Sequence, residues 1–134
     1  MCKLLQQYGP LLGRILLSVI FIIAGAKKTF SFAGTAGYMA SKGLPMTEVL
    51  LVVTIIIELG GGLMVLLGWR ARLASTAIFL FLIPVTLIFH PVWADAAEFN
   101  AFFKNLAIMG GMMYIMVYGS GPLSLGHDHC PDKK

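Results

Sequence analysis

The stretch VLLVVTIIIELGGGLMVLLGW, residues 49–69, decides the fold. It is apolar apart from Thr54 and one acid, Glu58, which stands near its centre beside three glycines. The hydrocarbon core of a bilayer is about 30 Å thick, and an α-helix needs about 20 apolar residues to cross it. The stretch therefore predicts a membrane-spanning helix over about residues 47–69, with a carboxylate near the bilayer midplane.

The composition of the whole chain supports a membrane protein. Of 134 residues, 58% are hydrophobic and 12% are charged, whereas ordinary soluble domains are about 45–50% apolar and about 25% charged. The net charge of +4 comes from basic residues scattered at the ends of apolar runs, which is typical of topology signals in membrane proteins. We therefore expect the lipid bilayer, and no nucleic acid, as the surroundings of the chain.

Four apolar segments are long enough to cross a membrane. They cover about residues 11–28, 47–69, 72–90 and 99–119. None of them shows the alternation of a half-buried strand. The sequence predicts an all-α, polytopic membrane protein: one four-helix transmembrane domain over residues 1–126, followed by a polar, disordered tail over residues 127–134. Residues 33–41 are expected to form a short interfacial helix, and Pro84 is expected to kink the third span.

An even number of spans places both termini on the same side of the membrane. That side would collect six basic residues and the other side four. Because basic residues favour the cytoplasmic side, we expect a multi-pass protein whose termini lie in the cytoplasm.

The central acid, Glu58, needs partners. An ionisable residue within a span faces the bundle interior or a water-filled cavity by default, and a buried charge must be paired or hydrogen-bonded. The candidate partners belong to the first and fourth spans: Arg14, Lys28, Lys104 and Asn105. Thr54, four residues before the acid, could donate a hydrogen bond to it. Two interpretations stay open: an ion pair that only fixes helix register, or a polar pocket for a headgroup, a quinone or a proton relay.

Two glycine patches predict close helix contacts. Gly60, Gly61 and Gly62 follow the acid in the second span, and Gly110 and Gly111 lie in the fourth. Small residues let neighbouring membrane helices approach closely. We expect the two patches to meet or flank each other, with the acid pointing into the seam between them.

The tail contains side chains that bind metals. His127, Asp128, His129 and Cys130 are consecutive, and imidazole and thiolate groups suit zinc and copper. Adjacent ligands rarely complete a tetrahedral site by themselves, so we expect no metal site, and a metal held by His127, His129 and Cys130 is the alternative.

An ordered set of segments resembles a known family. GRILLSVIFIIAGAKK, then GLP, then ELGGGLMVLLGWRARLA, then FFKNLAIMGGMMYIMVYGSGPLSL are similar to the DoxX family of small bacterial four-helix membrane proteins. The similarity covers about residues 11–125. It departs at Leu125 and Gly126, where relatives often have an Asp, and the HDHC run is outside the family pattern.

The resemblance implies an integral protein of the bacterial inner membrane. Members of the family have been linked to membrane oxidoreductase assemblies, one of which oxidises thiosulfate and reduces quinone, and to the handling of oxidative stress. By this analogy, we expect an accessory or quinone-facing subunit of a membrane redox complex.

The sequence contains no haem-ligand pair within the spans, no iron–sulfur cysteine set and no flavin motif. We therefore expect no covalently bound cofactor, and any redox activity would depend on a quinone or on a redox partner protein. Two other functions stay open: a solute-binding or lipid-binding module or transporter, which would function as a homo-oligomer, and a structural membrane partner.

Overall fold

The second span is a helix whose winding changes at its centre. In the computed structural model it consists of α3 (Thr47–Ile55), the π-helical segment η1 (Ile56–Gly61) and α4 (Gly62–Leu67). A π-helix has wider turns than an α-helix and is often found at functional sites. Glu58 lies within η1, so the predicted span is confirmed as a helix, and the change of winding coincides with its acid.

The structure describes residues 1–126, so the expected disordered tail and its metal-type ligands lie outside the described residues. The other helices are α1 (Cys2–Phe30), α2 (Phe32–Ser41), α5 (Ala71–Phe89), η2 (Ala96–Glu98) and α6 (Phe99–Tyr118). Only α1 differs much from expectation, because it begins well before residue 11. Its first residues include Lys, Leu and Gln, which are good helix formers, so the helix continues beyond the apolar span.

Glycines with positive φ end two of the spans. Gly68 ends α4 with φ 71°, and Gly119 follows α6 with φ 80°. Gly68 also has no room for a side chain, because an added Cβ would collide with Arg14 and Ser124. Pro84 lies inside α5, which continues as a helix on both sides of it.

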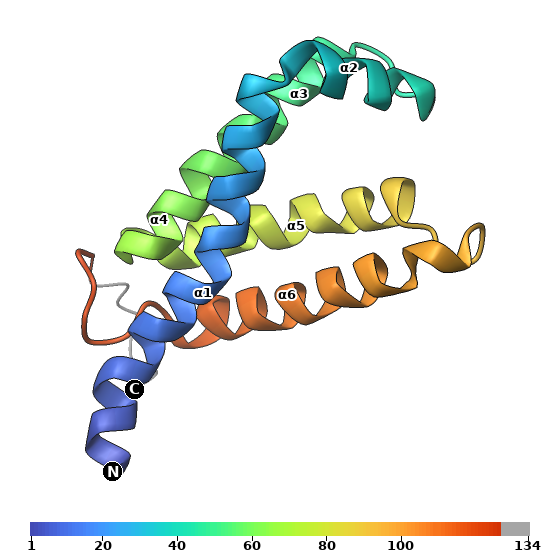
Figure 1. Ribbon diagram of the computed structural model, residues 1–134. Helices are drawn as coiled ribbons and strands as arrows, with labels where there is room; N and C mark the ends of the chain where they lie inside the picture. The colour runs from blue at the N-terminus through green and yellow to red at the C-terminus, as the bar shows by residue number, and fades with distance from the viewer. Residues whose placement is uncertain (127–134) are drawn as a thin grey trace, which may run out of the picture.

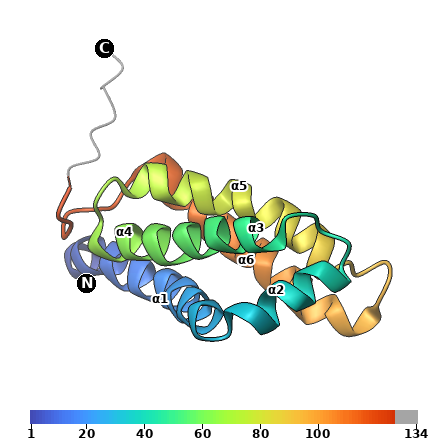
Figure 2. The same ribbon diagram turned by 90° about the horizontal axis from the view of Figure 1, so that it is seen from above.

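The helices form two pairs (Figure 1). The second span lies between α1 and α5, and α5 packs along α6, whereas α1 and α6 meet over a short stretch only. We call the end with the start of α1, the α4–α5 turn and residues 119–126 the terminal end. The opposite end, with α2 and residues 90–98, is the far end. Figure 2 shows the four spans running side by side between these two ends.

The apolar core lies between the spans at the centre of the bundle. Its buried residues are Phe21, Val65, Ala71, Ala74, Ile78, Leu82, Met112 and Ile115. Large apolar side chains also cover the outer surface: Leu16 is 76% exposed and Ile56 is 63% exposed. Such a surface suits lipid rather than water.

The four spans are long and apolar enough to cross a membrane. Trp69 and Trp93 are exposed near opposite ends of the bundle, where indole rings anchor proteins at the two membrane interfaces. The described chain is therefore a polytopic helical membrane protein, as its sequence predicts.

Candidate functional site

An ion pair joins the first span to the second. The Nζ atom of Lys28 lies 2.9 Å from Oε1 and 2.8 Å from Oε2 of Glu58, so one ammonium group donates to both carboxylate oxygens. The side chain of Glu58 is 7% exposed and that of Lys28 is 28% exposed. The acid is thus buried with its charge paired, and the base extends from it toward the far end.

A close helix contact brings this pair together. An added Cβ at Gly25 would lie 2.7 Å from Cγ of Leu59, so only a glycine lets α1 approach η1 this closely. Lys28 is three residues after that contact, on the same face of α1, and Glu58 directly precedes Leu59. The segment GAKK in the first span therefore supplies both the glycine that lets the helices approach and the lysine that forms the ion pair.

A small cavity surrounds the ion pair. Its volume is about 170 Å³, and all four spans contribute to its lining. The polar or ionisable side chains are Lys28, Glu58, His90, Lys104 and Asn105. The apolar ones are Ile20, Phe21, Ala24, Leu82, Val85 and Ile108. The cavity thus combines polar groups with apolar walls, the usual character of a small-molecule site.

Two further polar contacts border this cavity. Asn105 Nδ2 on α6 donates to Thr86 Oγ1 on α5 over 3.1 Å, and both residues are buried. His90 Nδ1 lies 2.7 Å from Oε2 of Glu98 at the far end. In the part of the chain that the structure describes, no hydrogen bond or ion pair engages the ammonium group of Lys104.

Three of the predicted partners of Glu58 therefore line its cavity. Lys28 makes the ion pair, while Lys104 and Asn105 contribute from α6 without contacting the acid within hydrogen-bond distance. Thr54 does not line the cavity, and within residues 1–126 it donates no hydrogen bond to Glu58. The spacing of four residues aligns side chains only in an α-helix, and the chain becomes π-helical from residue 56.

Arg14 belongs to a different part of the bundle, so its prediction as a partner of Glu58 was wrong. It lies 14 residues before Lys28 on the same helix, which is about 21 Å along the axis. It is 2% exposed, and its terminal nitrogens donate to the carbonyl oxygens of Leu66 and Leu123. Arg14 thus holds together the end of α4 and the segment after α6.

The two glycine patches do not meet, which corrects a further prediction. Gly61 packs on Ile78 of α5, and Gly62 packs on α1 at Ile22. Gly111 instead faces Leu17 of α1, while Gly60 and Gly110 have no neighbour within 4 Å of an added Cβ. No close backbone contact joins α6 to η1 or α4 in the described chain. Both patches therefore contact α1, at different positions, and they do not contact each other.

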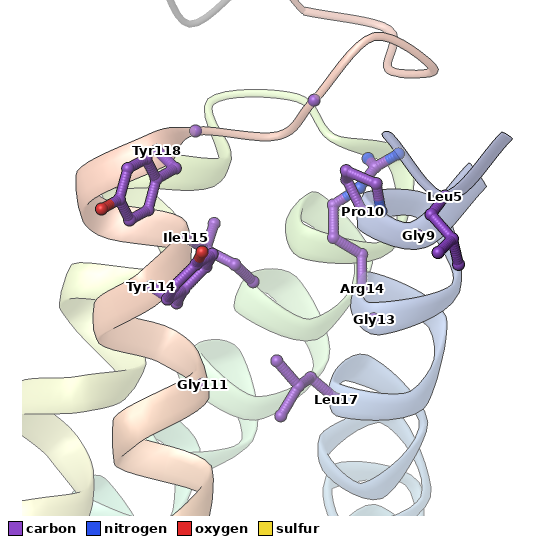
Figure 3. Close-up of a pocket in the computed structure, with 12 residues that line it drawn as sticks. Leu5, Gly9, Pro10, Gly13, Arg14, Leu17, Gly111, Tyr114, Ile115 and Tyr118 are labelled. Carbon is purple, nitrogen blue, oxygen red and sulfur yellow. The ribbon is translucent and has the colours of Figure 1, made fainter. Parts of the chain in front are cut away.

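A second, larger cavity was not predicted. It is a groove of about 460 Å³ between α1 and α6 at the terminal end (Figure 3). Its lining is mostly apolar and includes Leu5, Leu17, Tyr114, Ile115 and Tyr118. Gly9 and Gly13, four residues apart on α1, also line it. That spacing was the available signal, because two glycines on one helix face leave a hollow unless a neighbour fills it.

Residues 1–126 contain no group of three or more His, Cys, Asp or Glu side chains that could hold a metal ion. The candidate ligands His127, His129 and Cys130 lie outside the described residues.

Comparison with known proteins identifies relatives. The family model described as DoxX matches residues 9–91. The chain is 37% identical over 125 residues to the inner membrane protein YqjF of Escherichia coli, covering 92% of this chain and 93% of that protein. It is 32% identical over 120 residues to the inner membrane protein YphA of the same organism, covering 86% of each. No solved structure matches the chain.

Proposed function

This chain belongs to the DoxX family of integral inner-membrane proteins, and from that membership and its polar cavity we propose that it is a quinone-facing accessory subunit of a membrane redox complex. The observation that carries the proposal is the paired Lys28 and Glu58 inside a cavity that offers further, unused donors. A pair that only fixed helix register would need no open space around it.

The donors of the cavity suit the carbonyl oxygens of a quinone ring. Lysine carries three N–H donors and a carboxamide carries two. The ammonium group of Lys28 donates to the two carboxylate oxygens of Glu58, and one N–H of Asn105 donates to the hydroxyl oxygen of Thr86. Lys104 has all its donors available among the described residues. Two carbonyl oxygens of one ring can therefore be bound from α1 and α6.

The volume and the walls suit one ring. An engineered apolar cavity of about 150 Å³ binds benzene, and this cavity measures about 170 Å³. Phe21 and Leu82 are buried core residues on its wall, so a ring would contact apolar side chains on its faces while its oxygens face the lysines.

Glu58 gives the cavity a group that can exchange protons. Reduction of a quinone to a quinol takes up two electrons and two protons. The electrons would come from a redox partner protein, and a carboxylate beside the ring can pass protons to it. His90 lines the same cavity and pairs with Glu98 outside it, so protons could reach the cavity from the far-end surface.

A small anionic solute is the second candidate ligand. Lys28, Lys104 and His90 line the cavity together with Glu58, and Glu98 pairs with His90. Lys104 has no acidic partner among the described residues, so its positive charge favours an anion there. In this case the chain would be a solute-binding membrane module without redox chemistry.

The test is ligand-dependent stability of the purified protein in detergent. A tailless ring, 2,3-dimethoxy-5-methyl-1,4-benzoquinone, should raise the unfolding midpoint of the wild type, because a ligand at 100 times its Kd stabilises the folded state by about 2.7 kcal/mol. Glu58→Gln and Lys104→Met should remove most of that shift.

Matched controls separate binding from general destabilisation. Glu48→Gln changes an exposed acid at the start of the same span, and Lys27→Met changes an exposed lysine next to Lys28; both should keep the full quinone shift. If no quinone shifts the wild type, the proposal is refuted. If inorganic anions suppress the quinone-dependent shift by binding at Lys104, the solute-binding alternative replaces the proposal.

A further inference from the structure

The α1–α6 groove ends inside the bundle. On α1 its lining runs from Leu5 to Leu17, which is about 18 Å along the helix axis. At the inner end Leu17 points from α1 toward α6 (Figure 3), and an added Cβ at Gly111 would lie 2.9 Å from its Cδ1 atom. Phe21 and Met112, directly beyond this contact, are buried. The groove is therefore closed by the apolar core at one end, and it extends to the terminal end of the bundle.

The length of the groove matches one leaflet of a bilayer. The hydrocarbon core is about 30 Å thick, so each leaflet contributes about 15 Å. Tyr114 and Tyr118 line the groove from α6 and are each 68% exposed, and tyrosine is enriched at membrane interfaces. An acyl chain that enters at this interface and reaches the bilayer centre would extend along the whole groove. A transmembrane helix of a second copy would instead need a groove across both leaflets.

The α1 wall of the groove has space for such a chain. Gly9 and Gly13 lie one turn apart on this wall, and an added Cβ at either glycine would meet no atom within 4 Å. The rest of the lining is mostly apolar. The groove thus offers a hydrocarbon chain apolar contacts from two helices.

One buried cation borders the groove without an acidic partner. Arg14 lines the groove and is 2% exposed. Its terminal nitrogens donate to two backbone carbonyl oxygens, whereas its Nε atom is buried and has no hydrogen-bond partner in the described chain. No ion pair within residues 1–126 includes Arg14. Because burying an unpaired charge is costly, Arg14 favours an anion at this end of the groove.

The surrounding charges favour the same kind of ligand. Among residues 1–126, the acids lie at the far end or near the bilayer centre: Glu48, Glu58, Asp95 and Glu98. The terminal end contains further basic residues: Lys3, Arg70 and Arg72. Basic residues at a membrane surface attract anionic lipids. The end at which a lipid headgroup would lie is therefore positively charged throughout the described chain.

We infer that the α1–α6 groove binds a phospholipid with an anionic headgroup. One acyl chain lies between α1 and α6, and the phosphate group lies at the terminal end near Arg14. The leaflet length and the closed inner end select an acyl chain, and the unpaired cation selects the charge of the headgroup. The inference does not depend on the proposed function, because the groove and the polar cavity share no lining residue.

The experiment measures lipid binding by native mass spectrometry of the protein purified in one detergent. Dioleoyl phosphatidylglycerol is anionic and dioleoyl phosphatidylcholine is zwitterionic, and both have the same acyl chains. Gly13→Leu fills the groove, and Arg14→Gln removes the charge. Gly110→Leu is the matched control for the first variant, because this exposed glycine on α6 does not line the groove. Leucine favours a helix more than glycine does, so both leucine variants should fold.

The wild type should bind phosphatidylglycerol about tenfold more tightly than phosphatidylcholine, because a hydrogen bond between charged groups is stronger than a neutral one. Gly13→Leu should weaken binding of both lipids by about tenfold or more, since its side chain takes the place of the acyl chain. Gly110→Leu should keep both affinities within about twofold of the wild type. Arg14→Gln should bind the two lipids about equally, with phosphatidylcholine bound as in the wild type.

Four outcomes would overturn the inference. If Gly13→Leu binds both lipids as tightly as the wild type, the groove holds no acyl chain. If the wild type binds the two lipids equally, or a folded Arg14→Gln keeps the preference, Arg14 does not select the headgroup. If Gly13→Leu changes a dimer into a monomer and leaves lipid binding intact, the groove is an interface between two copies of the chain. If Arg14→Gln does not fold, Gly13→Leu still decides, because a preference for phosphatidylglycerol that survives in it would arise outside the groove.

Discussion

Removing Lys28 should destabilise the protein more than removing its partner Glu58. Lys28→Met leaves a carboxylate that is 7% exposed and has lost the donor to both of its oxygens. Glu58→Gln leaves an ammonium group on a side chain that is 28% exposed, and a long basic side chain near a helix end can extend to the membrane surface. The two single variants break the same ion pair, but one leaves a buried charge and the other leaves a charge that can reach the membrane surface.

The expected magnitudes follow from this difference. Breaking a buried ion pair from one side costs about 3–5 kcal/mol because it leaves a buried charge uncompensated. We expect this range for Lys28→Met. For Glu58→Gln we expect about 1–2 kcal/mol, because the amide oxygen still accepts a hydrogen bond from Lys28. The double variant should cost less than the sum, with a coupling of about 2 kcal/mol.

The assay is reversible unfolding in mixed micelles, followed by the fluorescence of Trp69 and Trp93. Lys27→Met is the control, since this exposed neighbour lies outside the cavity, and it should change the unfolding free energy by less than about 0.5 kcal/mol. Equal costs for Lys28→Met and Glu58→Gln, or additive costs in the double variant, would refute the reasoning.

Three other predictions test separate features. Arg14→Leu should cost about 2–3 kcal/mol because two backbone carbonyls lose their donor; unchanged unfolding in the same micelles would contradict it. Asn105→Leu should cost about 1 kcal/mol by leaving the buried Thr86 hydroxyl without its donor, and the loss should disappear when Thr86→Val is already present. Cys2 is exposed, so in a Cys130→Ser variant a membrane-impermeant maleimide should label it in inside-out vesicles only; labelling in right-side-out vesicles would place the termini outside the cytoplasm.

The spans could be predicted from sequence because membrane helices depend on local composition. Runs of about 20 apolar residues are visible without any knowledge of packing. The short helix at residues 32–41 was also predictable, since it ends shortly before a Gly–Leu–Pro stop. The early start of α1 was missed because a hydropathy pattern marks where a span enters lipid, not where its helix begins.

The ion pair was only partly predictable. The sequence identifies Glu58 as an acid that needs a partner and offers several basic residues, but it contains no distances between helices. Lys28 is the partner because Gly25 lets α1 approach Leu59 of η1. That contact depends on how two helices are rotated against each other, which a single sequence does not state.

Two of the incorrect predictions have the same origin. Arg14 was one of four candidate partners of the acid because a sequence displays charged side chains and does not show backbone carbonyls, which are its actual partners. Gly61 and Gly111 were matched to each other because both are small, although they face different helices. In both cases the residue type was informative, and the neighbour was set by three-dimensional packing.

The π-helical segment makes the second span tolerant of a change in length. A π-helix holds an additional residue within a helix that is otherwise α-helical. Deleting one residue between Ile56 and Gly61 should let the segment rewind as an α-helix while α3 and α4 keep their outer contacts. The chain could be shortened there with little loss of architecture, and the position of Glu58 relative to Lys28 would be what changes. A deletion of one residue in this segment would thus separate Glu58 from Lys28 without replacing either residue.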